Sequence, residues 1–519
     1  RSNPLKDKGF VPGDYSQENY DKIDLHRPYV DYIVLVNDEG KPMHRESDLI
    51  DVWFDSGSMP YAQLHYPFEG EMARGTEADR QALVNSTYEG YAIPPKFYPA
   101  DFINEGVDQT RGWFFTLHAI ATMVFDSVAF KNVISSGLVL DAKGNKMSKH
   151  LGNAVNPFEM IDKYGADAVR FYMMTNSEPW DNLKFDPTGV DEVRRKFFGT
   201  LYNTYSFFSL YANVDGFDYA EADVPVNERP EIDRWIISVL NTLVKKVDAE
   251  MQNYDPTRAG RLIDTFVNDD LSNWFVRLNR KRFWGKEMSK DKLSAYQTLY
   301  TCLETVAKLL APFAPFYADQ LYMDLVKATG RDNVCSVHLA KFPVADESVI
   351  DHDLEERMGL AQKITSMVLA LRRKVNIKVR QPLQEIMIPA VDEVQKAHIE
   401  AVKELVMNEV NVKELKFVEG SGILVKKVKC NFRTMGKKFG KLMKGIAAAM
   451  GELNQEQIAE LEKQGNIALN VEGNDVTVEA ADVEIISEDI PGWLVSNEGN
   501  LTVALEVELN EELRREGMA

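Results

Sequence analysis

Cysteine is scarce in this sequence, with only Cys302, Cys335 and Cys430 among 519 residues. Their wide spacing provides neither a disulfide framework nor a Cys-x-x-Cys metal pair, so we expect a reducing environment and no zinc site in this chain. Long apolar runs are also missing, because no stretch approaches the roughly eighteen apolar residues that a membrane-spanning helix needs. The sequence therefore predicts a cytoplasmic protein with no membrane partner.

Other features are missing at the two ends and among the histidines. The chain begins Arg1-Ser2-Asn3-Pro4, with neither an initiator methionine nor a signal peptide, and it stops in a charged stretch, 511–519, that is typical of the start of a helix. The eight histidines never occur as His-x-x-His. We therefore expect this chain to be a piece of a longer protein.

Basic residues are outnumbered, and their distribution is uneven. Eighty acidic and sixty basic residues give a net charge of −20, which repels polyanions at long range and argues at first against a nucleic-acid partner. Residues 421–451, the basic segment, are the exception, because they contain no Asp or Glu and carry a charge of +8. The composition, 45% hydrophobic and 27% charged, is that of a soluble globular protein, and the length predicts about two to five domains.

The first part of the chain has the pattern of an α/β structure. Apolar residues at 29–36, followed by a turn at 37–40, predict a strand and a hairpin. Between 48 and 180, short strand candidates alternate with helical stretches, which indicates a parallel sheet. The strand candidates are 51–54, 101–103 and 132–134, and the clearest helix is 112–125.

The pattern changes after residue 191, where apolar residues recur at steps of three and four. These stripes predict a bundle of helices over 191–345, with breaks at the prolines of 255–256 and 311–312. The stripes lie at 232–251, 262–284 and 295–325. After residue 343, helices at 354–374 and 393–408 and strands at 466–471, 475–480 and 501–507 predict a small α/β appendage. The fold class is therefore multidomain, α/β plus all-α.

The loop between Gly144 and Gly152 contains two lysines three residues apart, Lys146 and Lys149. Glycine lets a backbone approach a ligand closely, so such a loop is able to bring two ammonium groups to the phosphates of a ligand. For an isolated Lys-x-x-Lys loop, a solvated surface turn explains the pattern as well.

Residues 146–150, Lys-Met-Ser-Lys-His, resemble the KMSKS signature of class I aminoacyl-tRNA synthetases, with His150 in place of the last serine. Residues 51–57, 105–114 and 164–170 resemble, in that order, the second half of the catalytic domain of the isoleucyl-tRNA synthetase family. Residues 271–277 and 311–316 are similar to the anticodon-binding helical domain of the same enzymes. The resemblance covers the chain from about residue 20.

This resemblance implies a domain layout. Residues 1–48 would be the tail of an editing insertion, and 49–190 the second half of a Rossmann-type catalytic domain with its KMSKS-type loop. Residues 191–345 would form the α-helical anticodon-binding domain, and 346–519 a C-terminal α/β appendage truncated at its end. The family's HIGH motif and editing site are missing, so we expect this chain to be inactive alone.

The resemblance also implies an activity, the ATP-dependent ligation of isoleucine to its tRNA through isoleucyl-adenylate. ATP, Mg²⁺, isoleucine and tRNA are the expected ligands, and a monomer is the expected state. Valyl- and leucyl-tRNA synthetases share the architecture and remain alternatives. A tRNA-binding module without catalysis is an alternative of another kind.

Site residues follow from the matching motifs. Lys146 and Lys149 would hold the phosphates, with Ser148 as the third catalytic residue. The adenylate would be bound by Glu105, Gly106, Asp108 and Gln109, and the isoleucine side chain by Trp53 and Trp113. Asp108 also fits the N-cap of the following helix, and both tryptophans fit an ordinary core.

Contacts to tRNA are expected where cations gather, because phosphate neutralisation supplies most of the affinity for RNA. The candidates are Arg277, Arg280, Lys281 and Arg282 in the helical domain and Lys437, Lys438 and Lys441 in the basic segment. A further group lies at the domain junction, residues 372–380. Each group taken alone also fits a solvated face. The aromatic residues Trp274, Phe275, Phe283 and Trp284 fit either stacking on anticodon bases or the bundle core.

Overall fold

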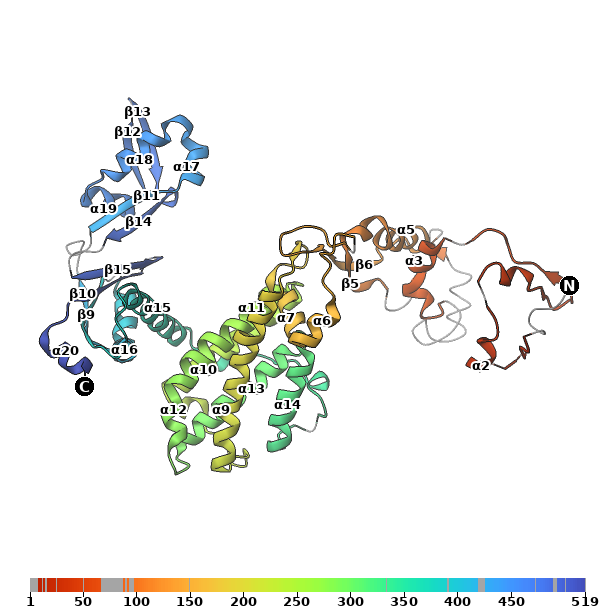
Figure 1. Cartoon of the computed structure of the whole chain (residues 1–519), viewed down its shortest axis with the longest axis horizontal. Coiled ribbons are helices and arrows are strands. Elements are labelled where there is room, and N and C mark those ends of the chain that lie inside the picture. Colours follow the sequence, from red (N-terminus) through yellow and green to blue (C-terminus); the bar gives the residue numbers. More distant parts are fainter. Residues whose placement is uncertain are drawn as a thin grey trace. The chain divides into compact units, whose positions relative to one another are not determined.

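The computed structural model describes residues 8–518 apart from 12, 15, 25, 50, 67–86, 89, 90, 93–97, 149, 333, 390, 391, 419–424, 472, 489–491 and 500. Its contacts divide the chain into two compact units (Figure 1). One consists of Arg1–Asp191 with Gln252–Thr257, and the other of Glu192–Met251 with Arg258–Ala519. Among the described helices, none has the length and apolar character to cross a membrane.

A parallel strand pair organises the first unit. Strands β5 (Ala100–Gly106) and β6 (Phe130–Ser136) pair in parallel, and helix α5 (Trp113–Phe125) connects them. Leu117 and Ala121 of this helix are buried in the core that it forms with neighbouring residues. The predicted strands at 101–103 and 132–134 and the helix at 112–125 are confirmed. Because parallel strands end at the same edge of a sheet, the loops after β5 and β6 begin side by side.

Helix α3 (Val52–Ala62) corrects the prediction of a strand at 51–54. The carboxylate of Asp51 accepts a hydrogen bond from the Trp53 amide at 2.9 Å and so caps the helix. A short apolar run fits a strand or a buried helix equally well, and here the cap decides for the helix. Helix α3 packs against α5.

The other elements of the first unit are short. The hairpin predicted around residues 37–40 is confirmed, because β1 (Leu35–Val36) pairs antiparallel with β2 (Pro42–Met43). The strand predicted from residue 29 is wrong at its start, where Tyr29–Tyr32 form a 3₁₀ turn. The remaining elements are α2 (Gln17–Tyr20), β3 (Thr87–Tyr88), β4 (Tyr91–Ala92), η3 (Val107–Arg111), β7 (Val139–Leu140), α6 (Pro157–Tyr164), α7 (Ala166–Asn176), β8 (Leu183–Lys184) and α8 (Pro187–Val193).

Long helices build the first part of the second unit, and the predicted bundle is confirmed. Helix α13 packs against α9, α12 and α14 (Figure 1). Breaks occur where the prolines predicted them, since α11 begins at Pro256 and the turn after Leu310 contains Pro312. The helices are α9 (Gly199–Asp215), α10 (Glu231–Gln252), α11 (Pro256–Thr265), α12 (Arg277–Trp284), α13 (Lys290–Leu310) and α14 (Pro315–Thr329).

Between α11 and α12 the backbone continues as a π-helix, η6 (Phe266–Val276). A π-helix bonds residue i to i+5 and so has more residues per turn than an α-helix. Phe266, Leu271 and Val276, spaced five apart, are all buried. The wider turn therefore keeps this spacing of apolar residues on the core side. A shorter π-helical stretch, η4 (Arg194–Phe198), precedes α9.

Residues after 350 form two separate cores rather than the single appendage that the sequence predicted. The first is a four-stranded sheet with the order β10-β9-β16-β15, in which β9 and β10 are parallel and α16 connects them. Helix α15 packs along α16 and against β15 and β16. Its elements are α15 (His352–Lys374), β9 (Leu383–Pro389), α16 (Glu393–Val410), β10 (Val412–Val418), β15 (Trp493–Glu498), β16 (Leu501–Glu506) and α20 (Glu511–Met518).

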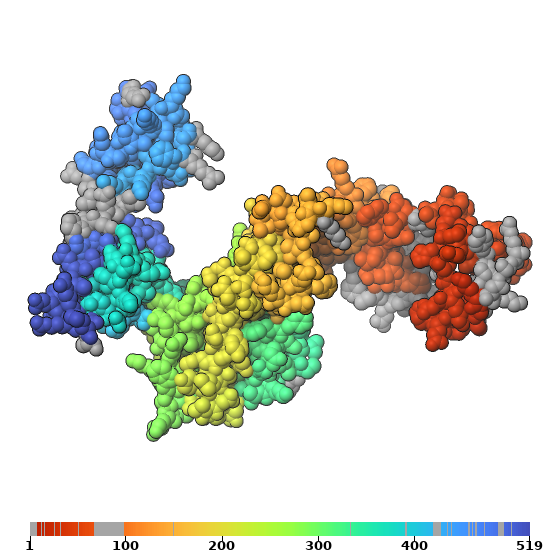
Figure 2. All heavy atoms as spheres, viewed as in Figure 1, coloured from red at the N-terminus to blue at the C-terminus, as the bar shows by residue number. Residues whose placement is uncertain are grey.

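The second core belongs to a lobe that contains most of the basic segment and is light blue in Figure 2. Met435, Ile446 and Leu461 are fully buried among its helices and strands. The strands predicted at 466–471 and 475–480 are confirmed as an antiparallel pair. The elements are β11 (Val425–Cys430), α17 (Phe432–Phe439), α18 (Met443–Gly451), α19 (Gln455–Gln464), β12 (Asn466–Val471), β13 (Asn474–Glu479) and β14 (Val483–Glu488).

Candidate functional site

Glu105 and Gly106 are the last two residues of β5, at the carboxyl edge of the parallel pair. Glu105 therefore belongs to the strand itself, and its side chain is exposed. In parallel α/β sheets, ligands bind outside the carboxyl ends of the strands. A side chain placed directly at Gly106 would meet the Asp108 carboxylate at 2.6 Å, so the glycine allows this carboxylate to approach the strand end.

The side chain of Gln109, rather than that of Asp108, reaches the first amide of helix α5. Its Oε1 atom accepts a hydrogen bond from the Trp113 amide at 2.9 Å. Asp108 lies within the 3₁₀ turn η3 and is exposed, with its carboxylate 3.3 Å from Gln109 Nε2. The N-cap alternative for Asp108 is therefore wrong. The exposed carboxylates of Glu105 and Asp108 both lie at this strand end, where a cationic amine or ribose hydroxyls would find acceptors.

Trp53 and Trp113 lie on α3 and α5, which pack against each other. The indole N–H of Trp113 donates to the Ser56 carbonyl oxygen at 2.8 Å. The Trp53 ring lies 3.0 Å from the point where a Cβ would stand on Gly112, and 42% of the residue is exposed. Both rings therefore lie next to the start of α5, where the adenylate residues were predicted. A role in an isoleucine pocket stays a prediction.

Ser135 is a neighbour of this site that sequence reasoning missed. It pairs in register with Glu105, and its buried hydroxyl has no hydrogen-bond partner. On the same edge, Asn104 donates to the Ser136 hydroxyl at 2.9 Å. A buried hydroxyl without a partner is costly unless a ligand completes it. No signal in the sequence separates this serine from others, because its position depends on strand register.

The lysine loop is built on Asp141 and Asn153. The Asp141 carboxylate accepts from Asn153 Nδ2 at 3.0 Å and from the Asn145 amide at 2.8 Å. These bonds lower the pKa of Asp141 to about 2. The Asn153 side chain also accepts from the Ser148 amide at 2.9 Å and donates to the Lys146 carbonyl oxygen at 3.2 Å. Asn153 therefore fixes the backbone on both sides of Met147.

The three predicted catalytic residues differ in how the structure describes them. Lys146 is exposed, and its backbone bridges to Leu140. The Ser148 hydroxyl accepts from the His150 amide at 3.2 Å. Lys149 lies outside the described residues. Among the described residues, no hydrogen bond or ion pair joins this loop to the Glu105 strand end.

In a longer protein that contains this chain and catalyses pyrophosphate exchange, replacing Asn153 by alanine is expected to lower the rate constant of exchange about tenfold. The three hydrogen bonds that its side chain makes in the loop are lost, each worth ~0.5–1.5 kcal/mol. The KM for isoleucine should stay unchanged, since Asn153 acts on Lys146 and Ser148 only through their backbone. Asn145→Ala is the matched control, because its side chain contacts only Asp141, at 3.3 Å. Equal rates for the two variants would contradict the positioning role of Asn153.

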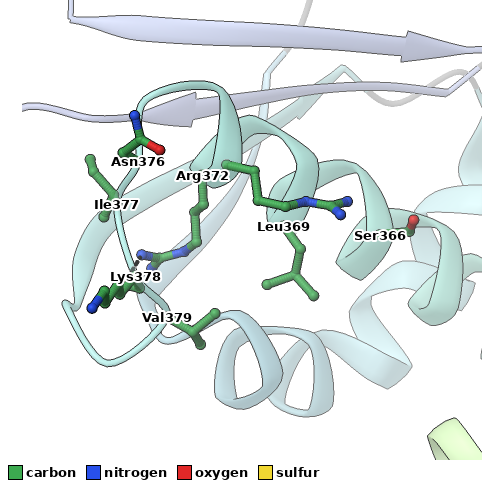
Figure 3. Close-up of a pocket in the computed structure, with 8 residues that line it drawn as sticks. Ser366, Leu369, Arg372, Asn376, Ile377, Lys378 and Val379 are labelled. Atoms are coloured by element: carbon green, nitrogen blue, oxygen red, sulfur yellow. Dashed lines mark hydrogen bonds between the residues drawn. The ribbon is translucent and has the colours of Figure 1, made fainter.

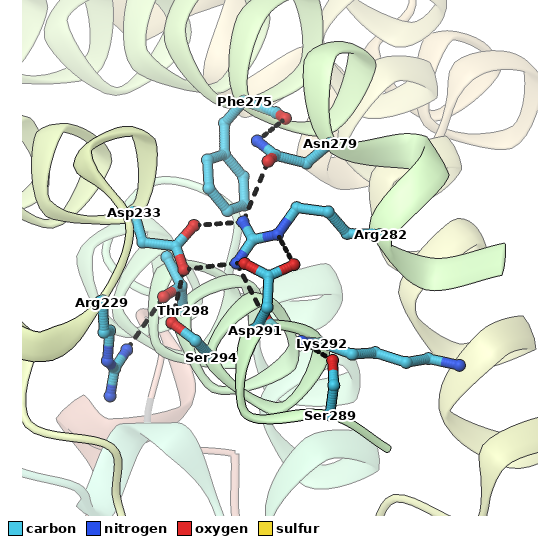
Figure 4. A network of polar contacts seen from close by, with 10 residues as sticks. All are labelled: Arg229, Asp233, Phe275, Asn279, Arg282, Ser289, Asp291, Lys292, Ser294 and Thr298. Carbon is cyan, nitrogen blue, oxygen red and sulfur yellow. Dashed lines mark hydrogen bonds and ion pairs between the residues drawn. The ribbon is translucent and has the colours of Figure 1, made fainter. Parts of the chain in front are cut away.

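Arg282 is engaged inside the helical bundle, which corrects its assignment to tRNA. Its Nη atoms contact both carboxylate oxygens of Asp233 at 2.6 and 3.0 Å, and its Nε contacts Asp291 at 3.0 Å. Ser294 donates to the same Asp233, whose side chain is completely buried (Figure 4). Only 14% of the Arg282 side chain is exposed. We expect this guanidinium to hold α10, α12 and α13 together rather than to bind phosphate.

The other predicted contacts of the bundle divide into two groups. Arg277 pairs with Glu409 of α16, whereas Arg280 and Lys281 are exposed on α12. The stacking role for Trp274, Phe275 and Phe283 is wrong, because all three are buried in the bundle. Trp284, with 57% of its surface exposed, is the one of the four aromatic residues that is open to a base.

In the basic segment, the charge of Lys438 is already paired with two carboxylates. Its ammonium lies 2.7 Å from Asp482 and 2.9 Å from Glu479, and these carboxylates raise its pKa. Lys441 and Lys444 are exposed, and the side chain of Lys437 lies outside what the structure describes. We therefore expect Lys441 and Lys444, rather than Lys438, to meet phosphates.

Salt dependence should separate these lysines. The double change Lys441→Gln and Lys444→Gln is expected to reduce the slope of log K against log salt for tRNA binding by about 1.4–1.8, since each phosphate contact contributes ~0.7–0.9. Lys438→Gln should leave the slope unchanged. Filter binding across a range of salt concentrations measures both. The same slope for the double variant and the unchanged chain would show that Lys441 and Lys444 do not contact phosphates and are only solvated surface residues.

The described residues offer no group of three or more His, Cys, Asp or Glu side chains placed to hold a metal ion. Such a group, rich in oxygen ligands, is what a protein-held magnesium site would need. No magnesium ligand is therefore assigned to these residues.

Two family models match different parts of the chain. The family of tRNA synthetases class I (I, L, M and V) matches residues 9–186, and the anticodon-binding domain of tRNA ligase matches residues 233–388. The second match continues past residue 345, where the sequence placed the end of that domain.

The relatives are longer than this chain. An isoleucine–tRNA ligase of Bacteroides thetaiotaomicron is 71% identical over 520 residues, which cover 100% of this chain and 43% of the relative. One from Porphyromonas gingivalis is 61% identical over 98% of this chain and 43% of its own length. The solved ternary complex of Agrobacterium radiobacter K84 LeuRS with tRNA and LeuAMS is 20% identical, with a TM-score of 0.44, and covers 62% of this chain and 37% of its own.

The chain thus spans less than half the length of the curated relatives that it matches. The match nevertheless covers the whole chain, so the matched range spans the lysine loop, the Glu105 strand end and the helical bundle. The chain therefore belongs to the isoleucine–tRNA ligases, within the class I tRNA synthetases.

Proposed function

We propose that the protein containing this chain ligates isoleucine to its tRNA with ATP, through isoleucyl-adenylate. The observation that carries this proposal is the 71% identity to an isoleucine–tRNA ligase over the entire chain. The lysine loop and the exposed carboxylates at the end of β5 supply side chains of the kind that such a reaction needs. A cytoplasmic location and a monomeric state stay predictions.

In the first step, a carboxylate oxygen of isoleucine attacks the α-phosphorus of ATP. The new P–O bond forms as the bond to pyrophosphate breaks, and the electron pair leaves with pyrophosphate. Lys146 and Lys149 would bind the phosphate oxygens, on which negative charge rearranges during this step. Glu105 and Asp108 would accept hydrogen bonds from the amine of isoleucine or from the ribose. Mg²⁺ would supply further charge neutralisation in this step when bound, and no described residue of this chain is assigned to hold it.

In the second step, a hydroxyl of the terminal tRNA ribose attacks the carbonyl carbon of the adenylate, and AMP leaves. This step requires tRNA to be held along the protein. The family match over residues 233–388 supports the helical bundle as the anticodon-binding part. Arg280, Lys281 and Trp284 are the exposed residues of α12 that are available for such contacts.

Pyrophosphate exchange into ATP tests the proposal, in a protein that spans the full length of the relatives. Isoleucine should support exchange with the highest kcat/KM, and valine should support a weaker reaction, because a hydrophobic pocket discriminates poorly against one missing methylene. Preference for valine or leucine would assign the chain to a sister enzyme. Exchange with none of the three, combined with intact tRNA binding, would favour a tRNA-binding module without catalysis.

A further inference from the structure

A cavity of about 650 Å³ lies between the end of α15 and the loop that follows it (Figure 3). On the helix it is lined at positions 366, 369, 372 and 373, whose spacing of three and four places them on one face. The loop closes the other side, after Asn376 turns the backbone with a φ of +57°. None of the residues that line it is acidic; they are Ser366, Leu369, Arg372, Arg373, Asn376, Ile377, Lys378 and Val379.

Arg372 places a buried positive charge in the wall of this cavity. Only 1% of the residue is exposed, and its Nη atoms donate to the carbonyl oxygens of Gln381 and Asn411, both at 2.9 Å, and of Lys378 at 3.2 Å. Its Nε atom has no hydrogen-bond partner. These contacts fix the loop, but carbonyl dipoles do not cancel a full charge.

Burial without a carboxylate lowers the pKa of Arg372 to about 10, so the guanidinium remains charged near neutral pH. A buried charge in a protein is ordinarily paired, because desolvation is costly. The exposed Arg373 and Lys378 add two further positive charges at the same cavity. An anion is therefore the ligand that the charge of this wall favours.

The apolar part of the cavity wall limits which anion fits. Leu369, Ile377 and Val379 contribute apolar surface, and 42% of Val379 is exposed. Inorganic phosphate would leave this surface uncovered, whereas a nucleotide has both a phosphate and a flat base. The volume lies in the range of sites for small molecules, about 300–1,000 Å³. In duplex RNA the bases are stacked and paired, so a base that enters the cavity must be unpaired.

We propose that this cavity binds one unpaired nucleotide of the tRNA, with its phosphate at Arg373 and Lys378 and its base against Val379. This proposal rests on the tRNA partner in the proposed function. Arg372 holds the loop through the carbonyl oxygens that it contacts, and its buried charge adds to the attraction for the phosphate. The side-chain amide of Asn376 is the polar group placed to contact a base edge.

The test uses the full chain and two fluorescent RNA probes with equal numbers of phosphates, one single-stranded and one duplex. The double change Arg373→Gln and Lys378→Gln should weaken binding of the single strand about tenfold at fixed salt and lower its salt slope by about 1.4, since each phosphate contributes ~0.7 in single strands. Val379→Ala should weaken single-strand binding about two- to fivefold with an unchanged slope, because it removes part of the apolar surface that the base would cover. Binding of the duplex should change less than twofold in both variants.

Lys327→Gln, at an exposed lysine of α14 outside the cavity, is the matched control for charge and should bind both probes like the unchanged chain. All substituted residues have exposed or half-buried side chains, and circular dichroism melting verifies that each variant folds. If the double variant binds the single strand as the unchanged chain does, the cavity is not the nucleotide site, while the tRNA partner of the proposed function is unaffected. Equal losses for the duplex would also overturn it, as they indicate general attraction. Absence of binding to either probe by the unchanged chain would overturn the tRNA partner as well.

Discussion

Alanine at Lys146 is expected to slow isoleucine-dependent pyrophosphate exchange about a hundredfold, because removing one preorganised electrostatic donor typically costs ~10²–10³ in kcat. The KM for isoleucine should change little, since the charge is needed chiefly as the phosphates rearrange. Lys149→Ala should act in the same direction. The assay requires a protein that spans the full length of the relatives, with initial rates measured at saturating ATP.

Lys143 provides the matched control for this experiment. It is an exposed lysine of the same loop, three residues before Lys146, and its backbone amide donates to Asp141 as before when the side chain is removed. Lys143→Ala should therefore stay within about twofold of the unchanged enzyme. An equally large loss at Lys143 would indicate that the loop supplies general positive charge rather than two positioned ammonium groups.

Arg282→Ala is expected to lower the free energy of unfolding of the helical bundle by about 3–5 kcal/mol, because it leaves the buried Asp233 without its partner. Among the side chains that the structure describes, the Ser294 hydroxyl, at 2.5 Å, would be the hydrogen-bond partner left to the Asp233 carboxylate. Urea unfolding followed by tryptophan fluorescence measures this loss, since Trp235 is buried on the same helix as Asp233.

Two further variants test whether the loss of stability comes from the unpaired Asp233 carboxylate. Arg280→Ala, on the exposed face of α12, should change the free energy of unfolding by less than about 0.5 kcal/mol. The double change Asp233→Leu and Arg282→Met should recover most of the lost stability, because replacing a buried pair by apolar groups is often neutral. Stability of Arg282→Ala close to that of the unchanged chain would return Arg282 to the candidates for phosphate binding.

Secondary structure could be predicted well where the sequence pattern is long or regular. The stripe at 232–251 became α10 within one residue at each end, and the alternating pattern at 466–471 became β12. The helix at 51–62 could not be predicted, because its start depends on one cap, Asp51. Nor does any local pattern indicate that β9 pairs with β16, more than a hundred residues later in the chain. Contacts between distant segments depend on the assembled core.

The sequence indicated the motifs of the candidate site but not the hydrogen bonds and ion pairs that hold its residues in place. The resemblance of residues 146–150 to the KMSKS signature, rather than the spacing of lysines and glycines, indicated the loop. Asn153 was missed because its three bonds are formed only when the loop closes on Asp141. Arg282 looked like its exposed neighbours because the sequence does not reveal a carboxylate 49 positions upstream. That Gln109 rather than Asp108 reaches the Trp113 amide could not be predicted for a similar reason, since only the turn geometry decides it.

The π-helix η6 also restricts how this family can vary in length. Each turn of this π-helix holds more residues than an α-helical turn, so Phe266, Leu271 and Val276, spaced five apart, share the buried side. Deleting one residue within Phe266–Val276 would break this spacing, and if the stretch rewound as an α-helix these three residues would no longer all face the core. A substitution keeps the number of residues in each turn, so we expect this stretch to diverge by substitutions rather than by deletions.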